Sequence, residues 1–461
     1  MKKKALLGLL LTLAVSIPVY AQDTVRVTMK EFVEKGVENA GKLKFEHKKI
    51  DLAHNKVNKV NNQRYLPKFE LSTQHGLVPG VKSNTDLSPD EYYLDPDLEN
   101  DWENWAVFTR AEISAIQPLY TWGAMSNAVK AAKAAAKAAK EQFEGQKADL
   151  KLRLVDLYQS RLLAYEIMNL LDEATGTIKK IGEQLEKKKE EGAEEFDESD
   201  YFKFKIFKSE FASKAAEVKK SAAMTQRIWD YVLQGDEGTF YVPDKKFLDP
   251  VPEDLEGIDF YRTHAISKRS EIEAIDAGIN AAKHGIEAEK GRNLPALVLG
   301  LNASFANTPN RARQSNPYIR NNSNYLSASF GFAIRQNLDF LSMKANVDKR
   351  KLQLKQAKYL KEAAVDGIVL EINEAYKDAT LSKAKIENTD DALVISKKWL
   401  RQEQLDYDFG IGETKDLIDA MKKKLELRVK LKRGIYKFNK NMAQLYRKSG
   451  FPMIEIFNEE K

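Results

Sequence analysis

The sequence predicts an α+β membrane protein with internal duplication, in which each protomer combines four transmembrane β-strands with very long α-helices. Three observations support this fold class. The same order of long helical tract and paired short segments occurs twice, proline is missing from long stretches, and the short segments alternate between apolar and polar residues. Such a duplicated unit behind a secretory signal points to the cell envelope.

The first 21 residues have the pattern of a cleavable signal peptide. Lys2–Lys4 supply the charged start, an apolar run follows from Ala5 to Val15, and Ala21 is a small residue before Gln22. The apolar run is shorter than the about 20 residues that a membrane-spanning helix needs. Because the chain has no cysteine, we expect neither disulfides nor a lipid-modified amino-terminal cysteine. A membrane location of the mature chain would therefore require β-strands.

Composition argues against several classes of function. The chain has 74 Lys and Arg against 68 Asp and Glu, and three of the lysines belong to the signal. Nucleic-acid-binding domains usually have a pI above about 9 and a basic patch, so we expect no nucleic-acid partner. The five histidines lack metal-site spacing, and Gly80, Lys82 and Ser83 do not fit a phosphate loop. We therefore expect no enzymatic activity, no cofactor and no metal.

Two long stretches are predicted to be helical. No proline occurs between Leu119 and Val242 or between Tyr318 and Phe451, and proline in a helix interior costs about 3 kcal/mol. The segment from Ala128 to Lys140 is nearly all alanine and lysine, which are strong helix formers. A helix from Gly123 to Lys189 would be on the order of 100 Å long.

Each long helical tract reaches glycine near its far end. Tyr158 stands 34 residues before Gly192, and Tyr376 stands 34 residues before Gly410, which Gly412 follows. Glycine supplies the backbone freedom that a chain reversal needs, so we predict helix–turn–helix tips near 192 and 410. An ordinary coiled coil or fibrous spacer is the alternative, and the duplicated interruptions argue against it.

The duplication predicts the domain organisation. Arg64-Tyr65-Leu66-Pro67 is followed 228 positions later by Arg292-Asn293-Leu294-Pro295, and Gln117 and Leu119 recur as Gln336 and Leu338. We predict a signal peptide at 1–21, a first repeat at 22–235, a connector at 236–260, a second repeat at 261–450 and a tail at 451–461.

Four short segments are predicted to be strands, near 66–77, 105–118, 294–306 and 325–336. In the fourth, Leu326, Phe330 and Ile334 share one parity, whereas Ser327 and Arg335 share the other. About 10 residues of this alternation match a tilted transmembrane strand, although a soluble antiparallel sheet has the same pattern. Four strands cannot close a barrel and an open edge is costly in lipid, so a membrane location requires several copies to pool strands.

The segments between the paired strands are long and polar. They extend over Val78 to Asn104 and Asn307 to Asn324, and barrel strands carry long loops on the outer side of the membrane. The first is rich in acidic and aromatic residues, and we interpret it as a solvated surface loop rather than a cation site.

The layout and one motif resemble the TolC-type outer-membrane channel family (outer membrane factors, or outer membrane efflux proteins). The motif runs from Tyr407, with Gly410 three positions on, to Asp416, Asp419 and Ala420. The run Gln117-Pro118-Leu119-Tyr120, which leads into a helix, also matches. The resemblance covers residues 22 to about 450.

The resemblance implies a homotrimer in the bacterial outer membrane. Each protomer would give four strands to a twelve-stranded barrel continuous with a periplasmic α-helical barrel, and an equatorial region would lie near Phe240 to Pro252. The implied function is the exit duct of a tripartite efflux or type I secretion system, a passive gated channel driven by an inner-membrane transporter through a periplasmic adaptor. Drug, metal and protein export share such a duct. The alternative is a secreted long-helix coiled-coil adhesin or envelope scaffold without channel activity.

The candidate site lies at the second tip. Asp416 and Asp419 are three residues apart and share a helical face, so in a trimer they would form two rings of carboxylates that select cations. The resemblance implies that these aspartates line the periplasmic aperture and that Tyr407 helps to hold inner and outer helices together. It also implies adaptor contact at both tips, where Gly192, Gly410 and Gly412 are the candidate glycines. Gly412 departs from the family member that this chain resembles, which has a basic residue there, so a closure held by an arginine link does not carry over. At the first tip, Asp200 aligns with Asp416 if two extra residues are allowed.

Overall fold

A computed structural model of the chain describes residues 24–192, 197–235, 239–314, 316–409 and 411–457. The predicted signal peptide at 1–21 and Gly410 lie outside these residues. The chain divides into two compact units that both draw on the two sequence repeats. Unit 1 contains Met1–Gly41, Lys147–Ala265 and Val369–Lys461, and unit 2 contains Lys42–Gln146 and Ile266–Ile368.

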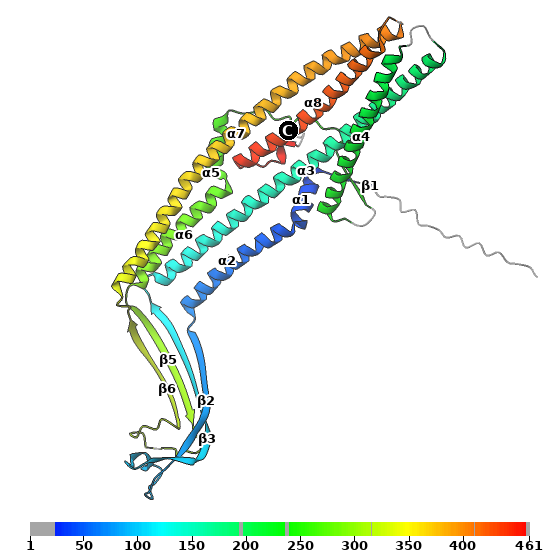
Figure 1. Cartoon of the computed structure of the whole chain (residues 1–461). Coiled ribbons are helices and arrows are strands. Elements are labelled where there is room, and N and C mark those ends of the chain that lie inside the picture. The colour runs from blue at the N-terminus through cyan, green and yellow to red at the C-terminus, as the bar shows by residue number, and fades with distance from the viewer. Residues whose placement is uncertain (1–23, 193–196, 236–238, 315, 410, 458–461) are drawn as a thin grey trace, which may run out of the picture. The chain divides into compact units, whose positions relative to one another are not determined.

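Unit 2 is built around a four-stranded antiparallel sheet with the order β2-β3-β5-β6 (Figure 1). Both hairpins of the sheet are formed by strands that are consecutive in the described chain. β2 and β3 extend further into the segment 78–104 than predicted, because Gly80 pairs with Asp101 beyond a bulge. The strands are β2 (Lys68–Lys82), β3 (Glu99–Tyr120), β5 (Ala296–Asn307) and β6 (Tyr325–Arg335).

The register of the sheet confirms the predicted alternation. One row across the four strands joins Phe69, Ala115, Leu301 and Phe330, and the neighbouring rows on this face are also mainly apolar. The adjacent row on the opposite face joins residues that are all polar, namely Glu70, Ser114, Asn302 and Ser329. Because successive side chains of a strand point to opposite faces, the sheet has one apolar and one polar face.

Four helices supply the rest of unit 2. Close backbone packing joins two of them to each other, since a Cβ at Gly291 would lie 2.8 Å from the backbone nitrogen of Ala124. Lys361 pairs with Asp276 at 2.7 Å and links α7 to α6. A short helix, η1 (Tyr92–Leu94), lies between β2 and β3. The helices are α2 (Gly41–Tyr65), the start of α3 (Ala124–Glu190), α6 (Ser270–Arg292) and the start of α7 (Phe340–Asp408).

Unit 1 contains the remaining parts of α3 and α7, packed with further helices. Its aromatic core centres on Phe32, Tyr158 and Trp229, whose ring centroids are 4.4 to 5.9 Å apart. A two-stranded parallel sheet joins β1 (Thr24–Val27) to β4 (Phe240–Pro243). The other elements are α1 (Met29–Asn39), α4 (Glu198–Leu233), α5 (Ile258–Lys268), α8 (Thr414–Ser449) and η2 (Glu455–Phe457).

The longest helices confirm the prediction from proline-free stretches. α3 has 67 residues and α7 has 69. Within α3, Leu154, Tyr158 and Leu162 are buried at intervals of four residues, which places them on one face of the helix. Among the described residues, no helix is both long and apolar enough to cross a membrane.

Candidate functional site

Both predicted tips lie in unit 1. The first joins α3, which ends at Glu190, to α4, and the second joins α7, which ends at Asp408, to α8. A shared hydrophobic cluster packs the helices of the two tips together. It consists of Ile167, Leu171, Ile178, Ile181, Leu185, Phe204, Phe211, Tyr407, Leu417, Ile418 and Met421.

Gly412 is required at the second tip because the chain folds back on itself there. The backbone N–H groups of Ile411 and Gly412 both donate to the carbonyl oxygen of Asp406, at 3.0 and 2.9 Å. A Cβ at position 412 would lie 2.7 Å from the nitrogen of Tyr407 and 2.8 Å from the carbonyl carbon of Asp406. Backbone atoms cannot swing aside as a flexible side chain can. A basic side chain at 412 is therefore incompatible with this turn.

Asp416 and Asp419 lie on the exposed face at the start of α8. The residues between and beside them, Leu417, Ile418 and Ala420, are buried against the tip cluster. The spacing of three therefore leaves both carboxylates together on the solvent side of the helix. Asp416 is in the first turn, where the helix dipole stabilises negative charge.

Tyr407 occupies the interior of the same tip. It is only 7% exposed, and the Nζ of Lys188 lies 4.4 Å from the centroid of its ring. This contact joins the end of α7 to the end of α3. Its hydroxyl oxygen is buried and has no hydrogen-bond partner among the described residues. Tyr407 therefore holds the two tips together through packing and a cation–π contact.

Asp200 is a site residue that we did not select from the sequence. It is 7% exposed, and its Oδ2 accepts the backbone N–H of Lys415 at 3.2 Å. Its Oδ1 accepts from Nζ of Lys203 at 3.0 Å, and this hydrogen bond raises the pKa of Lys203 above its usual value. α8 receives no hydrogen bond from the side chain of its own N-cap, Glu413. Asp200 of the first tip thus caps the first turn of α8 in the second. The alignment of Asp200 with Asp416 was the only sequence signal for it.

The three candidate glycines differ in their surroundings. Gly192 has a φ of +61°, in the left-handed region, and nothing lies within 4 Å of a Cβ added there. Gly412 instead needs the absence of a Cβ, as described above. Gly410 lies outside the described residues. Position 192 therefore favours glycine because of its backbone conformation, and position 412 favours glycine because a Cβ would clash with the backbone.

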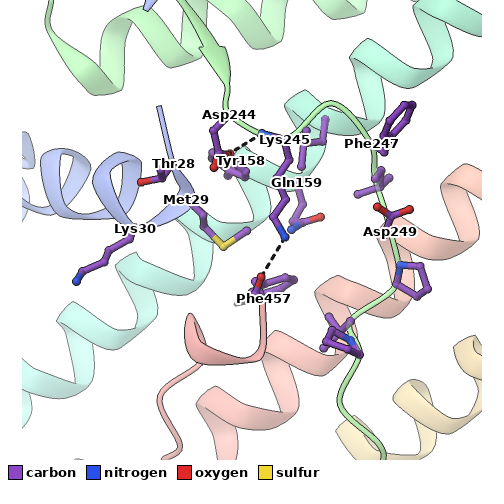
Figure 2. Close-up of a pocket in the computed structure, with 15 residues that line it drawn as sticks. Thr28, Met29, Lys30, Tyr158, Gln159, Asp244, Lys245, Phe247, Asp249 and Phe457 are labelled. Carbon is purple, nitrogen blue, oxygen red and sulfur yellow. Dashed lines mark hydrogen bonds between the residues drawn. The ribbon is translucent and has the colours of Figure 1, made fainter. Parts of the chain in front are cut away.

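A separate cavity of about 440 Å³ in unit 1 lies where the two ends of the described chain meet (Figure 2). The hydroxyl group of Tyr158 donates to Asp244, and Nζ of Lys245 donates to the carbonyl oxygen of Phe457 at 3.2 Å. Burial and the Asp244 carboxylate raise the pKa of Tyr158. The backbone N–H of Asp244 also donates to the carbonyl oxygen of Val27 at 3.1 Å, so both ends of the described chain are bonded to the loop after β4. Among the described residues, no group of three or more His, Cys, Asp or Glu side chains could hold a metal ion.

Known proteins share this fold. Residues 262–450 match the sequence model of a family described as outer membrane efflux protein. A comparison with curated protein sequences gives no match. The solved structure of CusC, described as forming a transmembrane channel, is 16% identical with a TM-score of 0.73, and 93% of each chain is covered.

Two further solved structures are outer-membrane channels from named bacteria. The CmeC channel of Campylobacter jejuni is 15% identical with a TM-score of 0.68, covering 94% of this chain and 87% of that one. The open-state MtrE channel of Neisseria gonorrhoeae is 15% identical with a TM-score of 0.70, covering 92% and 89%. At such identities the likeness shows a common fold, and the sequence match to the family covers the second repeat. Residues 262–450 thus match the outer membrane efflux protein family, and the chain has the fold of these solved outer-membrane channels.

Proposed function

We propose that this chain forms the outer-membrane exit duct of a tripartite efflux or type I secretion system. The observation that carries the proposal is the sheet of unit 2, which has one apolar face and whose outer strands, β2 and β6, each pair on one side only. Three copies pool twelve strands into a closed barrel, with the apolar face toward lipid and the polar face toward the lumen. The long helices extend the duct into the periplasm.

The gate of the duct lies at the tips. In a trimer, Asp416 and Asp419 form two rings of three carboxylates around the axis, which attract cations and repel one another. Tyr407 and the bond from Lys415 to Asp200 hold the tips together against this repulsion. The gate opens when these contacts are released.

Transport through the duct is passive. An inner-membrane transporter supplies the energy, and a periplasmic adaptor joins it to the duct at the tips near Gly192, Gly410 and Gly412. The exposed face of α8 beside these tips carries Lys415, Asp416 and Asp419. An adaptor that binds there acts directly on the residues of the gate.

Planar-bilayer recording on the purified trimer tests the gate. Replacing Asp416 and Asp419 together by alanine removes both carboxylate rings, so we expect a several-fold higher single-channel conductance and weaker block by divalent cations. Glu426→Ala is the matched control, because Glu426 is an exposed acid further along the same helix. Unchanged conductance in the double variant would remove the gating role. A soluble wild-type protein without conductance would instead overturn the duct and favour a scaffold or adhesin.

A further inference from the structure

The internal duplication of the sequence is reproduced in the register of the sheet. The repeat of Arg64-Tyr65-Leu66-Pro67 relates β2 to β5 by 228 positions, and the recurrence of Gln117 as Gln336 relates β3 to β6 by 219. Applying both shifts to a cross-strand pair of the first hairpin, Phe69–Ala115, gives Leu297–Ile334. The second hairpin forms this pair.

A second pair shows that this agreement extends along the strands. Leu71–Ile113 becomes Leu299–Phe332 under the same two shifts, and the structure forms this pair as well. Two offsets read from sequence motifs outside the paired residues therefore predict how the second hairpin pairs. The two hairpins are equivalent units of one repeating sheet.

The seam between the two hairpins is formed by β3 and β5. It pairs Ala115 with Leu301 and Ile113 with Ala303. β6 is the counterpart of β3 in the second repeat, and β2 is the counterpart of β5 in the first. Among the residues that the structure describes, the outer sides of these two strands are unpaired. An unpaired strand edge presents a row of backbone donors and acceptors that can pair with another chain.

We propose that β6 of one copy pairs with β2 of the next in the register of the β3–β5 seam. This inference rests on the proposed homotrimer and adds the residues that meet at its strand seams. The residue of β3 is moved forward by 219 positions to β6, and the residue of β5 is moved back by 228 positions to β2. Ala115–Leu301 then becomes Ile334–Thr73, and Ile113–Ala303 becomes Phe332–His75. On the polar face, Ser114–Asn302 becomes Ala333–Gln74.

Strand length supports this register independently. β6 runs from Tyr325 to Arg335, and its partners in the proposed register run from Lys82 to Ser72. All of them fall within β2, and the first residue of β6 meets the last residue of β2. The whole of β6 can therefore pair with residues of β2 along the edges that are free in a single described copy.

The faces of the strands agree as well. Ile334 and Phe330 lie on the apolar face of the sheet, and their partners Thr73 and Leu77 lie on the same face. A slip of one residue would move every side chain of one strand to the wrong face. His75 already contacts Thr109 through its Nδ1 at 3.1 Å, and the seam adds the ring of Phe332 on the opposite side.

Disulfide cross-linking tests the register, because the native chain contains no cysteine. Gln74→Cys and Ala333→Cys are combined in the full-length chain, and the membrane-extracted protein is oxidised. We expect covalent dimers and trimers under denaturing conditions, which a reducing agent returns to monomers. Chains that carry only one of the two cysteines, with different tags, should form a tagged heterodimer when co-expressed.

Two matched variants control the experiment. Gln74→Cys with Ser329→Cys keeps both cysteines on the polar face but moves one by four residues, about 13 Å along the strand, so it should not cross-link. Ser114→Cys with Asn302→Cys joins β3 to β5 within one copy, so it should cross-link without changing the mass.

The outcomes separate this register from the trimer itself. Cross-linking of the Ser329 variant but not of the Ala333 variant, in a protein whose native mass is that of a trimer, overturns the register alone. Absence of any intermolecular cross-link in a native trimer, while the Ser114 variant still closes, also overturns it. A native mass of one chain before oxidation would overturn the proposed homotrimer and thereby the proposed function.

Discussion

At the residue scale, the second tip depends on the lack of a side chain at Gly412. Gly412 sits against the backbone of Asp406 and Tyr407, and its N–H shares one carbonyl acceptor with that of Ile411. The turn can bring α8 back alongside α7 only if position 412 has no side chain. Asp200 supplies a link between the tips that does not need a basic side chain at 412.

Gly412→Ala tests this steric account. The added methyl group would lie 2.7 Å from a backbone nitrogen, so we expect unit 1 to lose about 1–3 kcal/mol and the amides of 405–417 to exchange faster. Hydrogen-exchange mass spectrometry measures the local effect. Gly176→Ala is the control, because Gly176 lies inside α3, nothing lies within 4 Å of its added Cβ, and alanine favours a helix by about 1 kcal/mol. Equal exchange in the two variants would contradict the account.

At the element scale, the two helical hairpins of unit 1 are capped differently. α4 is capped locally, because the Asp197 side chain accepts from the backbone N–H of Ser199 at 2.7 Å. α8 is capped from the other hairpin, because the backbone N–H of Lys415 donates to the carboxylate of Asp200. The start of α8, which also carries Asp416, is therefore stabilised by the contact between the two tips.

Asp200→Ala should consequently loosen α8 rather than α4. We expect a loss of about 0.5–2 kcal/mol, faster exchange of the Lys415 amide and a higher open probability in bilayers. Asp197→Ala removes a cap of similar strength from α4 and is the matched control. If Asp197→Ala accelerated the Lys415 amide as much as Asp200→Ala did, the capping across the tips would be wrong.

At the scale of the whole molecule, the proposed function depends on which face of the sheet contacts lipid. Phe332 and Ala333 are neighbours on β6 with side chains on opposite faces, and both are exposed in a single copy. In the proposed trimer the two residues differ, because one face would contact lipid and the other would contact water.

Phe332→Arg should reduce membrane insertion far more than Ala333→Arg. A charged residue on the lipid face costs about 2–4 kcal/mol near the bilayer midplane, whereas the polar lumen tolerates it. Quantifying the trimer in purified outer membranes measures the difference. Similar amounts of both variants would mean that the apolar face does not contact lipid.

Much of this architecture follows from local sequence. The limits of α3 agree with the predicted helix to within a residue at each end, because helix propensity and the absence of proline act over neighbouring residues. The two faces of β6 likewise follow from the alternation of Phe330, Gly331 and Phe332, because a strand has a period of two.

Other features depended on residues that are distant in sequence. Asp200 and Lys415 are 215 positions apart, and no local pattern indicates that the first tip caps the second. The crowding around Gly412 depends on the path of the turn. The pairing of Ala115 with Leu301 joins the two repeats. The sequence by itself shows that the repeats are similar, but not that they pair. Local propensity and periodicity determined the elements of this protein and their faces, and tertiary packing alone decided which elements meet, since those contacts form only after distant segments have folded together.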